Sequence, residues 1–464
     1  MMYDNVWRYF FMNPIGILVI GVVLLIAMIL VLRLNAFVAL ISSAIVVSLL
    51  SPGEFADKVT RVGQAFGTVA GSIGIVIALA AIIGKCMMDS GAADRIVRSF
   101  LKVLGEKRAP TALMLSGFVL SIPVFFDTVF YLLVPLARSL WSRTHKNYML
   151  YVTAIVAGAG IAHTLIPPTP GPLFMASELK VDVGLMMLIG LLIGLPTSIV
   201  GVLVCKLINR RMDIPMRPYA GQEEPDPLDE NQLPPFWISF APIALPVILI
   251  SLNTVTTALG VGKPMSQIAA VLGSRDMALL LAAAVAMFIL VHYRKISLKD
   301  LATRAETALM SGGIIILITA GGGAFGAMLR EAGIKKLLED MIGGQGQTVG
   351  LVLLLIAFAV AVVMKFAQGS GTVSMITTVS IFAAMGISPE MLGCNLVYLA
   401  MAIGSGSLVG DWMNNSGFWI FSRMGGFTEV ETLKSWTIVT AALGLIGLGF
   451  TMLFAYLLPM VPAV

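Results

Sequence analysis

Two polar stretches rich in glycine and proline interrupt the long apolar segments of this chain. The first covers residues 161–172 and contains four prolines, and the second covers residues 404–419 and contains four glycines. Shorter polar breaks precede them at residues 122–129 and 365–373. Backbone that leaves the helix is tolerated at bilayer depth only where it is buried in protein or lines a wet cavity. The four breaks therefore predict a buried site between two matched halves, a pattern typical of secondary transporters.

The composition indicates a polytopic membrane protein. The 464 residues are 58% hydrophobic and 12% charged, with a mean hydropathy of +0.95, so the polar surface is too small to cover a soluble globule. Many windows reach the roughly 20 apolar residues that cross a bilayer. The first, residues 14–32, is expected to be a retained span and not a cleavable signal. The net charge of +5 comes from Lys and Arg in short loops, where it orients the chain, so no nucleic-acid partner is expected.

The sequence carries no signal for a cofactor or a metal. Cys86, Cys205 and Cys394 are scattered without CxxC spacing, and no phosphate-binding loop occurs. The three histidines and three cysteines are dispersed, which leaves little material for a nucleophile with its base or for a metal cluster. We therefore expect a protein that is not an enzyme.

The predicted fold is an all-α membrane protein of two inverted repeats, each with five transmembrane helices and one re-entrant hairpin. An odd number of crossings per repeat inverts the second repeat relative to the first. The first repeat covers residues 1–206 and the second residues 236–464, with a cytoplasmic linker at 207–235. The hairpins are expected at 109–141 and 347–386, and the broken spans at 148–172 and 392–421. The uninterrupted spans are expected at 14–32, 35–50, 68–90, 183–205, 236–258, 278–292, 307–329 and 436–458.

Charge and glycine patterns complete this topology. Basic loops are expected at the cytoplasmic face, one with Arg95, Arg98 and Lys102 and another over residues 293–304. Glycine clusters are expected to allow close helix packing: Gly63, Gly67, Gly71, Gly74, Gly321, Gly322 and Gly323.

The first hairpin and the first broken span supply candidate site residues. Asp127 lies deep in an apolar stretch, where an ionised carboxylate costs about 2.5–3.5 kcal/mol. It is expected to bind substrate or a coupling proton, and the alternative is a structural ion pair or a hydrogen-bonded tip. His163 is a candidate for proton relay or substrate contact, or else a satisfied core histidine. Thr128, Thr164 and Thr169 are substrate-binding candidates, and capping alone is the alternative for the last two.

The second hairpin carries the turn 368–372, with three polar side chains and backbone N–H groups that can converge on an anion. Its candidates are Gly369, Ser370 and Thr372, and the alternative is a turn that only reverses the chain. Lys365 is expected to supply a counter-charge or to pair internally with an acid.

The second broken span offers Asn414, Asn415 and Ser416, whose donors and acceptors suit a polyol or a hydroxy acid. Asp411 is a further candidate for proton coupling. The alternative for Asp411 is a helix-end residue at the cytoplasmic boundary.

At these motifs the sequence resembles the gluconate permease family of bacterial symporters over essentially the whole chain. The stretches that carry the resemblance are Phe125-Phe126-Asp127 with Val134-Pro135-Leu136, His163 with residues 167–172, residues 367–373 and residues 414–419. The resemblance implies import of a small organic anion through the bacterial inner membrane, coupled to protons. The sequence leaves Na⁺ open as an alternative coupling ion. The substrate would be gluconate, a related sugar acid or glycerate, and some members use D-serine.

The resemblance also implies a homodimer in which a hairpin-bearing domain moves past a scaffold, that is, an elevator mechanism. A channel or an exporter on the same scaffold is the remaining alternative. Three departures bear on substrate and coupling. Thr169 stands where the family commonly has a histidine, Lys365 where an arginine is usual, and residues 411–415 differ from the family's Ser-His-Val-Asn-Asp. We hypothesise that Asp411 takes over the role of the acid that is replaced by Asn415.

Overall fold

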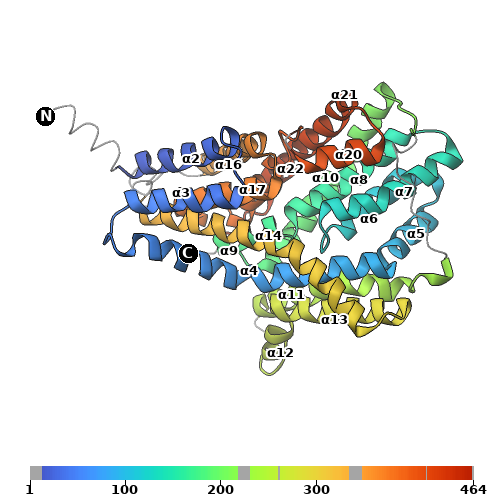
Figure 1. The fold of residues 1–464 in the computed structure, drawn as a ribbon, viewed down its shortest axis with the longest axis horizontal. Helices are drawn as coiled ribbons and strands as arrows, with labels where there is room; N and C mark the ends of the chain where they lie inside the picture. The colour runs from blue at the N-terminus through green and yellow to red at the C-terminus, as the bar shows by residue number, and fades with distance from the viewer. Residues whose placement is uncertain (1–12, 218–229, 260–261, 334–346, 414, 462–464) are drawn as a thin grey trace.

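The computed structural model of the chain describes residues 13–217, 230–259, 262–333, 347–413 and 415–461. All regular elements in these ranges are helices (Figure 1), and eight helices are apolar and long enough to cross a membrane. This confirms the prediction of an all-helical membrane protein. The first half comprises α2 (Pro14–Leu30), α3 (Ala36–Leu50), α4 (Asp57–Ser90), α5 (Ala92–Leu104), α6 (Ala109–Leu120), α7 (Phe126–Thr144), α8 (Tyr148–Leu165), α9 (Pro170–Glu178) and α10 (Val183–Arg211).

The second half follows a similar order. Its helices are α11 (Phe236–Ala258), α12 (Met265–Leu272), α13 (Arg275–Arg294), α14 (Leu298–Glu331), α16 (Gln347–Gln368), α17 (Gly371–Ala384), α18 (Pro389–Leu392), α19 (Leu396–Gly406), α20 (Ser416–Gly425), α21 (Glu429–Thr432) and α22 (Ile438–Leu457). A π-helical turn, Leu433–Thr437, precedes α22.

Apart from α5 and α12, the helices pack as two groups, each with members from both halves of the chain. The long-helix group contains α2, α3, α4, α11, α13 and α14, in which α4 and α14 lie along each other and α14 also packs on α3. The broken-helix group contains α6–α10 and α16–α22, in which α8 packs on α6 and α10, and α19 packs on α16 and α22. In Figure 1 the blue α3 and α4 accordingly lie beside the yellow α14, and the green α10 lies near the red α22.

Several helices extend beyond the predicted apolar spans. α4 begins at Asp57, not at residue 68, and α14 begins at Leu298, where Ser297 and Asp300 form a reciprocal capping box. Hydropathy locates only the apolar part of such a helix, because polar side chains on the exposed end do not prevent helix formation. The same argument corrects the predicted basic loop around Arg98, which is the helix α5. Its buried face contains Ala93 and Ile96.

The helices end at the four predicted breaks for local reasons. α8 stops at Leu165 because Ile166 precedes Pro167 and adopts an extended backbone, with φ −117° and ψ 119°. α9 then starts with Pro170, which fits the first turn because that turn needs no N–H bond. The break between α16 and α17 contains Gly369 with φ +79°, a conformation that glycine adopts without steric cost.

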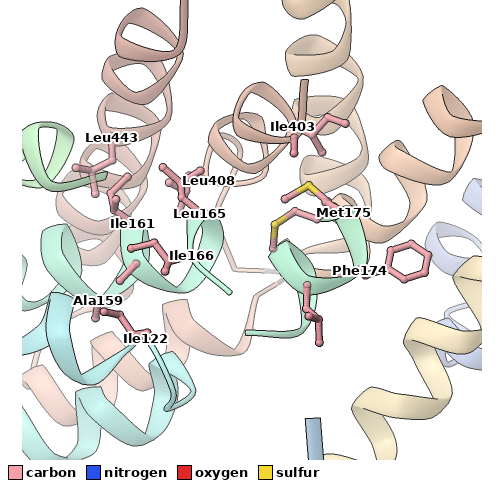
Figure 2. Close-up of a cluster of buried hydrophobic side chains, with 14 of the residues drawn as sticks. Ile122, Ala159, Ile161, Leu165, Ile166, Phe174, Met175, Ile403, Leu408 and Leu443 are labelled. Carbon is pink, nitrogen blue, oxygen red and sulfur yellow. The ribbon is translucent and has the colours of Figure 1, made fainter. Parts of the chain in front are cut away.

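The α8–α9 pair is the interior of the molecule. In its most apolar window, 94% of the residues are buried, so this span does not face lipid. Apolar side chains hold both sides of the break (Figure 2). A Cβ at Gly404 of α19 would lie 2.8 Å from Leu165 Cδ2 and 3.6 Å from Met175 Cε, so side chains from both sides of the break pack on α19.

Close helix approaches occur at some glycines and not at others. A Cβ at Gly158 of α8 would lie 1.9 Å from the carbonyl oxygen of Met114 in α6, so the two backbones touch. The predicted packing is also present at Gly322, where a Cβ would lie 1.9 Å from Ile376 Cγ2. The prediction was wrong for Gly63, Gly67 and Gly71, which have no atom within 4 Å of such a Cβ.

We expect Gly158→Ala to destabilise the protein by about 1–3 kcal/mol, because α6 and α8 must separate to admit the methyl group. Thermal unfolding of the detergent-solubilised protein measures this effect. Gly449→Ala in α22 is the matched control, since a Cβ there meets no atom within 4 Å. Equal unfolding temperatures for the two variants would contradict the close approach.

Candidate functional site

The four breaks meet at one cavity of about 500 Å³. This volume lies within the range of about 300–1,000 Å³ that is usual for small-molecule sites. The lining comes almost entirely from the broken-helix group, and only Ser311 and Ile315 come from α14 of the long-helix group. The cavity therefore lies at the boundary between the two packing groups.

Helix starts surround this cavity. Asp127 and Thr128 lie in the first turn of α7, Thr372 in that of α17, and Ser416 in that of α20, and all of them line the cavity. Pro170, the first residue of α9, lines it as well. The N-terminus of a helix carries a partial positive charge and N–H groups without intrahelical partners. Four such ends around one cavity favour an anionic ligand.

A buried ion pair lies at the cavity wall. Lys365 Nζ is 3.1 Å from Asp411 Oδ2, and the two side chains are only 2% and 5% exposed. The same ammonium group donates a hydrogen bond of 2.6 Å to the carbonyl oxygen of Gly369. The predicted counter-charge is thus paired internally with an acid, which was one of the two readings of Lys365. Asp411 is 4% exposed and lines this cavity.

Asn415 connects this ion pair to the start of α20. Its Nδ2 donates a hydrogen bond of 2.6 Å to Asp411 Oδ1, and its Oδ1 accepts one of 3.1 Å from the backbone N–H of Gly417. One side chain therefore caps the helix and holds the acid in place. Ser370 caps α17 in the same way, accepting a hydrogen bond of 3.3 Å from the N–H of Val373.

Two predicted titratable residues of the cavity have unpaired polar atoms. Within the described ranges the Asp127 carboxylate makes no hydrogen bond or ion pair, although it lines the cavity with Lys365 and Asp411. Nδ1 of His163 is buried and has no partner in the described part of the chain. The His163 ring packs edge-on against Phe125, with ring centroids 6.4 Å apart. Both groups therefore remain free to bind a ligand, a proton or water at the cavity.

Most of the predicted site residues line the same cavity. They are Asp127, Thr128, His163, Thr164, Lys365, Gly369, Ser370, Thr372, Asp411, Asn415 and Ser416. Thr169 does not line it: this residue is buried, and its hydroxyl donates a hydrogen bond of 2.7 Å to the Ile166 carbonyl within the break. Asn414 lies outside the described residues.

Some lining residues escaped the sequence analysis. Ser311 and Ile315 belong to a long apolar helix, and Thr440 and Trp436 lie where an uninterrupted span was expected. A polar run at residues 434–437 was the only available signal, and it was shorter than the four recognised breaks. Gln368 belongs to the recognised turn, and both polar atoms of its amide lack partners among the described residues.

The fold and the cavity at its helix breaks define an all-helical, multi-pass membrane protein with a polar interior site. The chain belongs to the GntP permease family, whose model matches residues 13–457. Among its relatives, the inner membrane permease YgbN of Escherichia coli K12 is 33% identical and covers 92% of this chain and 95% of its own. A gluconate permease of Pseudomonas aeruginosa is also 33% identical, and the match covers 95% of this chain and 96% of that permease. The protein is a multi-pass protein of the bacterial inner membrane.

Solved structures share the fold at much lower identity. The YdaH transporter of Alcanivorax borkumensis is similar with a TM-score of 0.64 and 13% identity, covering 92% of this chain and 98% of its own. A second similar structure is MtrF of Neisseria gonorrhoeae, described as illuminating a class of antimetabolite efflux pumps. It has a TM-score of 0.66 at 14% identity, and the match covers 92% of this chain and 96% of MtrF. These likenesses concern the fold alone.

We expect Lys365→Met and Asp411→Asn each to destabilise the protein by about 3–5 kcal/mol, because each removes one member of a buried pair. The double variant should cost clearly less than the sum of the two, because no unpaired charge remains. The wild-type protein, the two single variants and the double variant form a double-mutant cycle, which thermal unfolding in detergent measures.

Arg217→Met is the matched control for this cycle. Its ion pair with Glu431 has an N–O distance of 2.7 Å, but the arginine side chain is 42% exposed, so the loss should not exceed about 1 kcal/mol. Strictly additive losses for Lys365 and Asp411 would contradict direct coupling.

Proposed function

We propose that this protein imports a small hydroxy acid, such as gluconate, a related sugar acid or glycerate, by proton symport. The observation that carries the proposal is the cavity itself, where four helix N-termini meet Lys365 and two carboxylates. The positive helix ends and the lysine suit a carboxylate, and the hydroxyl and amide side chains suit the rest of a hydroxy acid. The relatives named gluconate permease support this substrate class.

The buried ion pair suggests how the proton is coupled to the anion. Lys365 and Asp411 together are neutral, and an anion that displaces Asp411 from the ammonium group would leave one uncompensated negative charge. A proton on Asp411 restores neutrality, so the site accepts the anion and the proton together. An uncompensated charge inside the membrane costs about 2.5–3.5 kcal/mol, which corresponds to a coupling factor on the order of 100. Asp127 and His163 are the other candidates for the proton.

The proposed architecture is two inverted repeats with re-entrant hairpins. The helix α4 and the helix α14 each contain 34 residues and start 298 − 57 = 241 positions apart. The helices after the breaks recur similarly, since α7 and α17 start 371 − 126 = 245 positions apart, and α9 and α20 start 416 − 170 = 246 positions apart. These recurrences support the repeat. A homodimer belongs to the same proposal through the family resemblance.

We further propose an elevator mechanism, in which the broken-helix group carries the substrate past the long-helix group. The support is that one group supplies almost the whole lining and the other only Ser311 and Ile315. With this division, the cavity can move together with the broken-helix group, while a different part of the long-helix group comes to face it.

Uptake into proteoliposomes tests the function. Labelled gluconate, glycerate and D-serine are offered separately, with and without an inward proton gradient, and with a sodium gradient in parallel. We expect concentrative uptake of a hydroxy acid that vanishes when the proton gradient collapses. For one proton per substrate, a gradient of two pH units drives about 100-fold accumulation. Uptake that only equilibrates would indicate a channel, and uptake of D-serine alone would change the substrate class.

Asp411→Asn tests the coupling residue. We expect this variant to lose gradient-driven accumulation while it still exchanges labelled for unlabelled substrate, because the asparagine stays neutral. Asp213→Asn is the control, since this exposed acid follows α10 outside the cavity. Wild-type accumulation by Asp411→Asn would contradict the assignment of Asp411 as the coupling residue. Asp127 and His163 would then be tested in the same way.

The elevator proposal is tested at a contact between the two groups. Arg330 of α14 and Glu178 of α9 form an ion pair of 2.7 Å. We expect a bismaleimide bridge between Glu178→Cys and Arg330→Cys to reduce uptake by at least tenfold, because it ties the carrier to its scaffold. Each single cysteine variant treated with the same reagent is the control. Wild-type uptake by the bridged protein would contradict the movement.

A further inference from the structure

A π-helical turn interrupts the last long helix beside the cavity. Residues Leu433–Thr437 form this turn directly before α22, and Trp436 within it lines the cavity. The hydroxyl of Thr440 donates hydrogen bonds of 3.0 and 3.2 Å to the carbonyl oxygens of Trp436 and Thr437. Turns of this kind are rare and occur frequently at functional sites.

Aromatic neighbours and one glycine hold the indole ring of Trp436. The ring centroids of Phe126 and Phe421 are each 5.4 Å from that of the indole. A Cβ at Gly417 would lie 3.1 Å from Cζ2 and 3.2 Å from Cη2, so the six-membered edge of the indole rests on this glycine. Since Trp436 is only 3% exposed, its orientation is determined by packing.

The indole nitrogen of Trp436 is buried and has no hydrogen-bond partner in the described ranges. Two tryptophans nearby differ in this respect. Trp419 Nε1 donates a hydrogen bond of 2.8 Å to the carbonyl oxygen of Met413, and Trp412 Nε1 donates one of 3.2 Å to that of Phe366. A buried donor without a partner is costly, and buried indole N–H groups usually find one. Trp436 therefore brings to the cavity lining a ring whose N–H group is unpaired within the described ranges.

We propose that the Trp436 indole N–H donates a hydrogen bond to one hydroxyl group of the transported acid and so contributes to substrate specificity. This inference rests on the proposed function, because it concerns the same cavity and the same class of substrate. An indole N–H can only donate, so its partner must be an acceptor oxygen. The substrate carboxylate is expected at Lys365 and the helix starts, which leaves a hydroxyl oxygen for the indole.

Such a donor discriminates between acids by their hydroxyl pattern. A site built to hydrogen-bond a hydroxyl disfavours an analogue without it, because the buried protein group is then left without a partner. Hydrophobic contact alone discriminates less strongly. Trp436 would thus select among hydroxy acids of similar size and equal charge.

The experiment is a cycle between Trp436→Phe and the hydroxyl groups of gluconate. Phenylalanine keeps an aromatic ring between Phe126 and Phe421 but has no N–H group. The apparent affinities of gluconate and of its 2-, 3-, 4-, 5- and 6-deoxy analogues are measured by competition with labelled gluconate uptake. We expect Trp436→Phe to weaken gluconate about tenfold and to leave one deoxy analogue, which lacks the contacted hydroxyl, unchanged.

Trp237→Phe is the matched control, because Trp237 is 78% exposed on α11 and does not line the cavity. An unchanged gluconate affinity in Trp436→Phe would overturn the inference, and so would an equal loss for gluconate and all five analogues, which indicates general packing. A wild-type protein that neither takes up these acids nor is stabilised by them against heat contradicts the proposed function as well. Wild-type uptake without an effect of Trp436 contradicts this inference alone.

Discussion

The main physical constraint on the structure of this permease is that several of its helices end in the interior of the protein. Each break leaves backbone N–H and C=O groups without helical partners, and the hydrocarbon region offers no water to satisfy them. The chain meets this constraint by placing all four breaks within the broken-helix group and around one cavity. Capping by Ser370 and Asn415 satisfies part of the exposed backbone, and the remaining helix starts face the cavity. The need to satisfy backbone groups and the ability to hold an anion thus have the same origin.

The arrangement of the four breaks around one cavity also brings Lys365 and Asp411 together as a buried ion pair. A lysine in the last turn of α16 would be costly in the interior without an acid, and Asp411 reaches it from the loop between α19 and α20. Burying such a pair is weak evidence for stability, since an apolar pair of similar volume often serves as well. Its position at the cavity wall gives the pair another role in the proposed mechanism, where substrate and proton replace the internal contact together.

The division into two packing groups explains why so few residues connect the cavity to the long helices. α14 contacts α9 and α17 of the broken-helix group and supplies Ser311 to the cavity, while most of its length packs on α3 and α4. Its close approach to α17 depends on Gly322, which leaves room for Ile376. The long helices therefore form one wall of the site without contributing a charged side chain to its lining.

The sequence by itself determined the membrane environment, the helical class, the position of the four breaks and 11 of the 25 residues that line the cavity. These follow from local physics: apolar length, the restrictions that proline and glycine place on the backbone, and the cost of a charge such as Asp127 in an apolar segment. Helix ends with polar residues, such as the start of α4 at Asp57, were missed because hydropathy reports burial and not helix formation.

Only the tertiary structure decided which residues meet. Lys365 and Asp411 are 46 positions apart in the sequence, and no local pattern indicates that they pair or that the Thr169 hydroxyl bonds to the Ile166 carbonyl outside the cavity lining. The glycines show the same limit, because Gly158 lies against a neighbouring backbone whereas Gly67 faces open space, although both occur in apolar helices. Trp436 likewise lies at the cavity because Phe126, Phe421 and Gly417, which are distant in the sequence, pack around its ring. Contacts between distant segments depend on the shape of the whole fold, which one-dimensional spacing does not contain.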